Sequence, residues 1–182
     1  MTQTNTALVA IGAFVLGAAV ALGAQNFLFN KKDQRDDMQT VADFKGWRLS
    51  CPPRTLKNGY CVMNQALARK GTNQALAELN IAPKDKTDVL TVVAPLGVFI
   101  LPGVKVSAGS STPKTISYKT CLQIGCVATM PIDGDLAAAM SKSDSMQITV
   151  VADGKPVPLN FPLTGFRDAL AARAIDMAAR SK

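Results

Sequence analysis

The sequence contains no histidine among its 182 residues. Histidine is the base in Ser-His-Asp and Cys-His catalysis, a common proton shuttle near neutral pH and a frequent metal ligand. Its absence therefore excludes those catalytic arrangements and every histidine-ligated metal site. Chemistry based on carboxylates or lysine remains open.

Charge is missing from the first 30 residues, so all 20 basic and 13 acidic side chains fall in the rest of the chain. This distribution divides an apolar head from a body that carries the whole net charge of +7. Apart from Lys31-Lys32, the basic residues are scattered and form no stripe of the kind that binds a row of phosphates. We therefore expect no nucleic-acid partner. A basic surface near anionic lipid headgroups is the favoured interpretation.

The head contains an uninterrupted run, residues 7–24, without a polar or charged side chain. As a helix this run would span about 27 Å, close to the hydrocarbon thickness of a bilayer. We interpret residues 1–30 as a single transmembrane helix that anchors the chain in membrane lipid, and residues 31–45 as a linker. Ala13, Gly17 and Ala21 recur every four residues, so they predict a helix face that another membrane helix can approach closely.

A cleaved signal peptide is the alternative interpretation of the head. Ala19-Val20-Ala21 satisfies the small-x-small rule for cleavage, and residues 7–18 would supply the apolar core. Residues 1–6, however, lack the Lys or Arg with which a signal peptide begins. We favour the anchor, and cleavage after Ala21 stays open.

Two signals disagree on the side of the membrane that the body occupies. The basic residues after the head favour the cytoplasm by the positive-inside rule. The cysteines favour export, because Cys51 with Cys61 and Cys121 with Cys126 each flank a short turn segment, as local disulfides do. The spacing between the first two does not fit a zinc knuckle, and the C-x-x-C motif of redox enzymes is missing. We predict two disulfides and a periplasmic body.

Short segments rich in β-branched residues, separated by Pro and Gly, predict a mainly β body. Residues 74–81 are ambiguous between a helix and a strand. Helices are expected at 133–140, with Asp133 as N-cap, and at 167–179. The fold class is a disulfide-stapled β-sandwich over residues 46–182 with one or two peripheral helices. Strands are expected at 46–51, 60–68, 89–94, 98–101, 104–108, 116–121, 126–131, 146–152 and 157–161.

Several residues suggest function, and each has a structural explanation that we prefer. Trp47 is expected in the core beside a disulfide rather than at a recognition surface. The Pro- and Gly-containing segments 95–97 and 102–103 are interpreted as backbone bends rather than a binding rim. Asp133 and Asp135 fit capping and the helix dipole better than a catalytic pair. No catalytic, cofactor-binding or metal-ligating residue is predicted.

A series of short motifs runs through the body in a fixed order: Trp47-x-Leu49-x-Cys51 with Cys61, Ala94-Pro95-Leu96-Gly97-Val98, Leu101-Pro102-Gly103-Val104, Tyr118-x-x-Cys121, Gly125-Cys126-x-Ala128 and Leu163-x-Gly165-Phe166-x-x-Ala169-Leu170. With these motifs, residues 46–172 resemble the invasion-associated locus B family of alphaproteobacterial exported proteins. The resemblance implies an exported, all-β domain with two disulfides and no established enzymatic role. The retained head departs from the family, whose members typically resemble secreted proteins with cleaved signals.

These observations together predict a non-enzymatic, single-pass protein of the bacterial inner membrane. Its periplasmic body is expected to dock on another membrane protein or complex as an accessory subunit, with no cofactor. The alternative is a cleaved, secreted factor for invasion, adhesion or stress. An enzyme that uses carboxylates or lysine is the third possibility, and it would need a pocket with converging polar groups.

Overall fold

The computed structural model describes residues 38–56, 59–69, 71 and 75–180. Residues 38–182 form one compact unit. The predicted anchor over residues 1–30, with Ala13, Gly17 and Ala21, lies outside the described residues. Within the described part of the chain, no helix is both long and apolar enough to cross a membrane.

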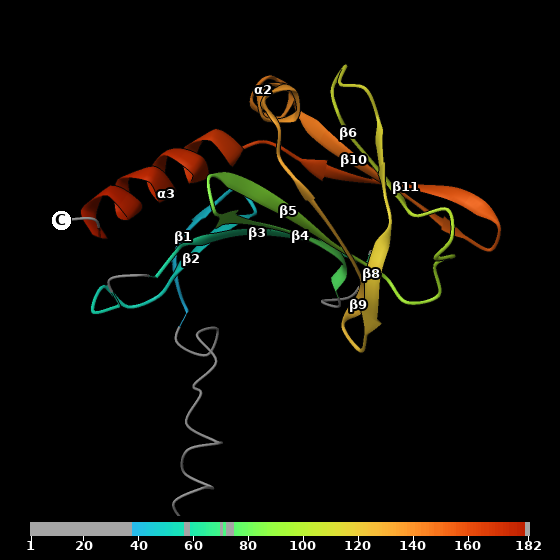
Figure 1. The fold of residues 1–182 in the computed structure, drawn as a ribbon, viewed down its shortest axis with the longest axis horizontal. Helices are drawn as coiled ribbons and strands as arrows, with labels where there is room; N and C mark the ends of the chain where they lie inside the picture. Colours follow the sequence, from blue (N-terminus) through green and yellow to red (C-terminus); the bar gives the residue numbers. More distant parts are fainter. Residues whose placement is uncertain (1–37, 57–58, 70, 72–74, 181–182) are drawn as a thin grey trace, which may run out of the picture. The chain divides into compact units, whose positions relative to one another are not determined.

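The body consists mainly of β-strands, with two helices in its C-terminal half (Figure 1). Both helices lie close to their predicted positions, and residues 75–81 of the ambiguous segment belong to a strand. The elements are β1 (Gln39–Phe44), β2 (Trp47–Cys51), β3 (Val62–Ala68), β4 (Ala75–Lys84), β5 (Thr87–Ala94), β6 (Val104–Ala108), β7 (Lys114–Ile116), β8 (Tyr118–Leu122), β9 (Gly125–Pro131), α2 (Gly134–Lys142), β10 (Ser145–Ala152), β11 (Lys155–Pro162) and α3 (Phe166–Arg180).

The described strands form two open antiparallel sheets. One has seven strands in the order β1-β2-β3-β4-β5-β9-β8, and the other has four in the order β11-β10-β6-β7. Most neighbours in each sheet are also neighbours in sequence, because short turns connect them as hairpins. The chain crosses between the sheets after β5, through residues 95–103. The mainly β class with two helices and two disulfides is therefore confirmed.

A single apolar core lies between the sheets, since strands of both contribute its buried residues. Alternate residues of β4, such as Leu79 and Ile81, point into it, as the period of a strand requires. Trp47 is fully buried, as predicted. Its ring packs at a tilt against Phe166 of α3, with ring centroids 5.2 Å apart. This contact joins the seven-stranded sheet to the last helix.

Asp133 caps α2, as predicted. Its carboxylate accepts a hydrogen bond of 3.0 Å from the backbone N–H of Leu136, which satisfies one of the unpaired donors at the start of the helix. The ammonium of Lys114 on β7 also bonds to this carboxylate. The bond from Lys114, together with the Leu136 N–H, holds the pKa of Asp133 below its ordinary value. Asp135 follows in the first helical turn, where the helix dipole favours a negative charge.

Two expectations about the strands are wrong. Residues 39–44, assigned to the linker, form β1, which pairs with β2 through the turn at Lys45-Gly46. Both turn residues have positive φ, 54° and 97°, and a Lys at such a position gives little sequence signal. Residues 98–101, expected as a strand, form only an isolated bridge between Val98 and Ala152, because the glycine and proline on either side bend the backbone.

Candidate interaction surface

The structure forms both predicted disulfides. Cys51 bonds to Cys61 in the core, where both residues are buried. Cys121 bonds to Cys126 at the end of the β8–β9 hairpin, where Cys121 is exposed and Cys126 is buried. No free cysteine is found among the described residues.

The C-terminal end of α3 holds the first disulfide in place. A carboxylate oxygen of Asp176 lies 3.1 Å from the Cys61 sulfur. Because that sulfur carries no proton in a disulfide, the approach is a close contact and not a hydrogen bond. Arg180 pairs with Asp176 and donates to the carbonyl oxygen of Pro52 at 2.8 Å.

The same three residues, Cys51, Cys61 and Asp176, are a buried group with the atom types of a metal site. A cysteine binds a metal through its thiolate, and here both sulfurs are consumed in the disulfide. The Asp176 carboxylate also forms an ion pair with Arg180. We therefore interpret the group as a structural contact that packs α3 against the loop closed by the disulfide, and not as a metal site.

Two shallow hollows occur beside the helices. One, of about 250 Å³, lies between the end of α2 and the start of α3, and its charged lining residues are all solvent-exposed. The other, of about 380 Å³, lies between α2 and the loop that follows β6. Charges that face water are strongly screened, so neither lining supplies the preorganised electrostatics on which catalysis depends. Neither hollow therefore indicates a reaction.

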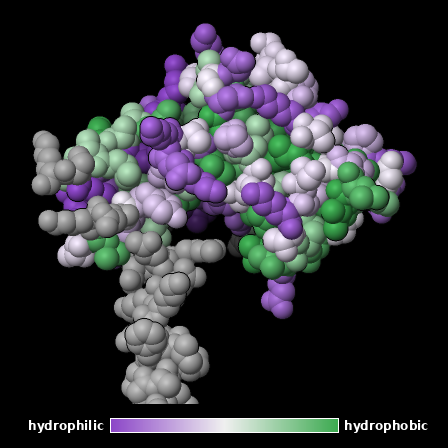
Figure 2. Space-filling view, viewed as in Figure 1, coloured by the Kyte–Doolittle hydropathy of each residue, from purple (hydrophilic) through white to green (hydrophobic). Residues whose placement is uncertain are grey.

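The described surface carries a conspicuous gathering of large apolar side chains. Six of the ten exposed large hydrophobic residues come from two segments, the crossover after β5 and the tip of the β8–β9 hairpin. Leu101 is fully exposed at 101%, and Ile124 is 73% exposed. Figure 2 shows hydrophobic surface over both segments. We name these six residues the apolar loop surface: Leu96, Phe99, Ile100, Leu101, Leu122 and Ile124.

Backbone hydrogen bonds hold the crossover segment while its side chains remain exposed. The N–H of Phe99 donates to the Val151 carbonyl of β10 at 2.8 Å, beside the bridge at Val98. The N–H of Gly103 donates to the Ile100 carbonyl at 3.0 Å and closes a turn. Gly103 has φ of 70°, and a Cβ there would lie 2.5 Å from the Ile116 carbonyl oxygen, so only glycine fits.

The hairpin tip is fixed beside the crossover in the same way. Ala94, the last residue of β5, pairs with Cys126 of β9. Gly125 has φ of 136°, and a Cβ there would lie 2.3 Å from the Ala94 carbonyl oxygen. The Cys121–Cys126 disulfide closes the tip. The two segments of the apolar loop surface therefore lie at the same end of the seven-stranded sheet.

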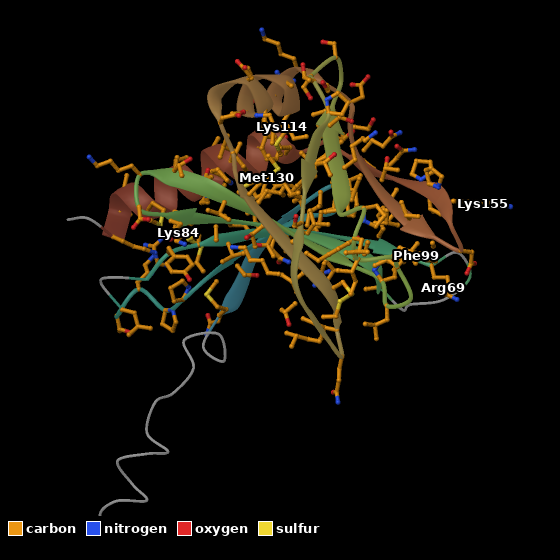
Figure 3. All side chains as sticks on the ribbon, turned by 45° about the vertical axis from the view of Figure 1, so that its right-hand side comes forward. Arg69, Lys84, Phe99, Lys114, Met130 and Lys155 are labelled. Atoms are coloured by element: carbon orange, nitrogen blue, oxygen red, sulfur yellow. A yellow bond between two sulfur atoms is a disulfide. The ribbon has the colours of Figure 1, made fainter. Side chains whose placement is uncertain are left out.

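The charges along this part of the chain have one sign. No Asp or Glu occurs between Asp88 and Asp133, whereas Lys105, Lys114 and Lys119 do. Lys105 on β6 and Lys119 on β8 are exposed. In Figure 3, Arg69 and Lys155 lie on the same side of the body as Phe99. The surroundings of the apolar loop surface are therefore predominantly basic.

Sequence reasoning found the bends of this surface but not its exposed side chains. The Pro and Gly residues at 95–97 and 102–103 do form bends, with positive φ at Gly97 and Gly103. The sequence did contain a signal for exposed side chains. The bends enclose Val-Phe-Ile-Leu, and β-branched and aromatic residues between two bends cannot pair with a neighbouring strand. The predicted helix-packing residues Ala13, Gly17 and Ala21 lie outside the described residues.

Comparison with known proteins gives consistent matches. Residues 47–174 match the family described as Invasion associated locus B (IalB) protein. The chain is 27% identical over 131 residues to an Invasion protein B homolog of Brucella abortus strain 2308, which covers 70% of this chain and 75% of that one. A homolog from strain 9-941 of the same species matches equally.

A solved structure also matches. The crystal structure of invasion associated protein B from Bartonella henselae superposes with a TM-score of 0.62 at 18% identity, covering 74% of this chain and 95% of that one. At this identity the likeness shows that the two proteins share a fold. The family match covers well over half of the chain, from the buried Trp47 into the last helix. The chain therefore belongs to the invasion associated locus B family.

Proposed function

We propose that this protein is a non-enzymatic interaction protein, anchored in the inner membrane, whose body works at the periplasmic face of that membrane. It docks there on a membrane protein complex as an accessory subunit. The observation that carries the proposal is the apolar loop surface, since large exposed apolar groups on a folded body mark interaction sites. The two hollows beside the helices, in contrast, are shallow and open to solvent.

The rigidity of the apolar loop surface supports a role in binding. A disulfide, two glycines at positive φ and a hydrogen bond to β10 hold its backbone. A surface fixed before binding loses little conformational entropy when its partner arrives. A segment that served only to connect two sheets would not need these backbone constraints.

Photocrosslinking in intact cells tests the proposal. A diazirine-bearing amino acid replaces Leu101 in the full-length chain, and the same replacement at Ile175 on α3, which is 73% exposed, serves as the matched control. We expect an adduct at position 101 and none at position 175. An absence of any adduct at position 101, with the chain migrating alone after mild detergent extraction, would contradict the proposal.

The names of the relatives favour a second candidate, a secreted invasion-related factor. In that case the head would be removed after Ala21, and the body would act away from the membrane. The intact mass of the protein from the envelope separates the two, because a mature chain that begins at Leu22 has lost the whole apolar run. A mass that includes residues 1–21 supports the anchored protein.

A further inference from the structure

We propose that the apolar loop surface inserts into the interface of an anionic lipid bilayer, and that this insertion sets how the body stands on the membrane. The proposal rests on the proposed function, in which the chain is held at a membrane. It names the partner of the surface as lipid, and not as a groove on another protein. Three observations support this choice.

The first observation is the form of the surface. Its six side chains project from a turn and a hairpin tip, and the two hollows among the described residues lie beside the helices instead. Protein hot spots are enriched in Trp, Tyr and Arg and lie in tightly packed pockets. The apolar loop surface contains none of these residue types. Projecting Leu, Ile and Phe side chains are typical of groups that enter the headgroup and acyl-chain boundary of a bilayer.

The second observation is charge. The stretch between Asp88 and Asp133 carries lysines and no acidic residue. Lys105 follows the crossover by two residues, and Lys119 precedes Leu122 by three, so both exposed ammonium groups flank the apolar side chains along the chain. Basic groups beside an apolar insertion site are attracted by anionic headgroups. Two acidic residues lie nearby in the fold. Asp153 is in a turn next to Lys155, and Glu78 of β4 pairs with Val93 just before the crossover.

The third observation is the length of the tether. The apolar run ends at Ala24, and Met38 begins the described body, so 13 residues separate them. Fully extended, such a segment spans at most about 45 Å. A body held this close to a bilayer meets lipid far more often than it meets a freely diffusing partner, because tethering raises the effective concentration.

Tryptophan fluorescence in reconstituted vesicles tests the proposal with the full-length chain. Leu101→Trp introduces an indole at the centre of the surface, and Ile175→Trp introduces one at a comparably exposed site on α3. The native Trp47 is fully buried, so the fluorescence of the unmodified chain gives the background that is subtracted from each variant. Each protein is placed in vesicles of phosphatidylcholine with phosphatidylglycerol that contain doxyl-labelled lipid. Near-ultraviolet circular dichroism checks that each variant is folded.

We expect a blue shift and strong quenching for Leu101→Trp and neither effect for Ile175→Trp. Quenching should weaken in pure phosphatidylcholine and with Lys105→Gln combined with Lys119→Gln. It should also weaken between about 0.1 and 1 M salt, where the screening length falls from about 10 to 3 Å. An unquenched indole at position 101, or equal quenching at both positions, would overturn the proposal.

The crosslinking experiment keeps this proposal separate from the proposed function. A lipid adduct at position 101 supports insertion into the bilayer, and it places any docking on a protein complex on another part of the body. A protein adduct there overturns insertion into lipid and leaves the interaction protein standing. The absence of any adduct contradicts both.

Discussion

At the scale of single residues, one carbonyl oxygen receives two side-chain hydrogen bonds across the core. The Pro162 oxygen accepts from the Trp47 indole at 3.0 Å and from the Gln65 amide at 2.9 Å. These bonds tie β2 and β3 to β11, the last strand of the other sheet. The side-chain oxygen of Gln65, by contrast, is buried and has no hydrogen-bond partner in the structure.

We predict that the two donors substitute for one another. Gln65→Leu removes one donor together with the unpaired oxygen, so it should cost less than about 1 kcal/mol. The double change Gln65→Leu with Trp47→Phe should lower the free energy of unfolding by about 1 kcal/mol more than the sum of the two single changes, because the Pro162 carbonyl then loses both partners. Urea unfolding of the four chains measures this coupling. Additive costs would show that water replaces the lost donors.

A second prediction concerns the cap at Asp133. Its pKa is lowered in the folded protein, so its charge contributes stability above the ordinary pKa of 3.8, and this contribution disappears as the pH falls through the lowered value. Asp133→Asn keeps a capping oxygen and loses the Lys114 pair, whereas Asp133→Ala loses both. Near neutral pH the melting temperature should fall in the order wild type, Asn, Ala.

In strong acid, well below pH 3.8, the wild type and Asp133→Asn should melt together, since both are then uncharged. Thermal melts followed by circular dichroism across this range measure the effect. A gap between the two proteins that persists in acid would show that the charge of Asp133 is not its cause.

At the scale of elements, the two disulfides serve different parts of the fold. Cys51–Cys61 lies in the core and contacts α3 through Asp176, and Cys121–Cys126 closes a hairpin tip at the surface. Closing loops with sequence separations of 10 and 5 stabilises by about 2.7 and about 2 kcal/mol in the chain-entropy model. Replacing the buried pair also leaves a cavity.

We predict that Cys51→Ala with Cys61→Ala destabilises the body substantially more than Cys121→Ala with Cys126→Ala. The second pair should chiefly loosen the apolar loop surface, and so reduce adduct formation at position 101 while the fold survives. Guanidinium unfolding, together with the crosslinking assay, measures both effects. Equal losses of stability from the two pairs would contradict this division.

Most elements could be predicted from the sequence because local chemistry specifies them. Asp133 marks a helix start, and the closely spaced cysteines mark two hairpins. β1 was not predictable, because a polar stretch becomes a strand only through its pairing with β2. The exposure of Leu101 and its neighbours was signalled only by the bends around them, since a run of apolar residues looks the same in sequence whether it is buried or exposed.

At the scale of the whole molecule, the decisive question is which residues the mature protein retains and in what redox state. We predict that protein extracted from intact cells has a mass that includes residues 1–21 and contains no thiol that reacts with an alkylating agent. Both disulfides are expected in an oxidising compartment. Four reactive thiols would place the body in a reducing compartment, and a chain that begins at Leu22 would remove the anchor.

The pairing of each cysteine with its nearest neighbour in sequence affects how the protein matures. Four cysteines allow three connectivities, and the native one encloses the two shortest loops. Cys61 precedes Cys121 by 60 residues. A polypeptide that meets oxidant from its N-terminus onward can therefore form the first bond before the third sulfur emerges. Maturation should consequently proceed without reshuffling, and independently of any isomerase.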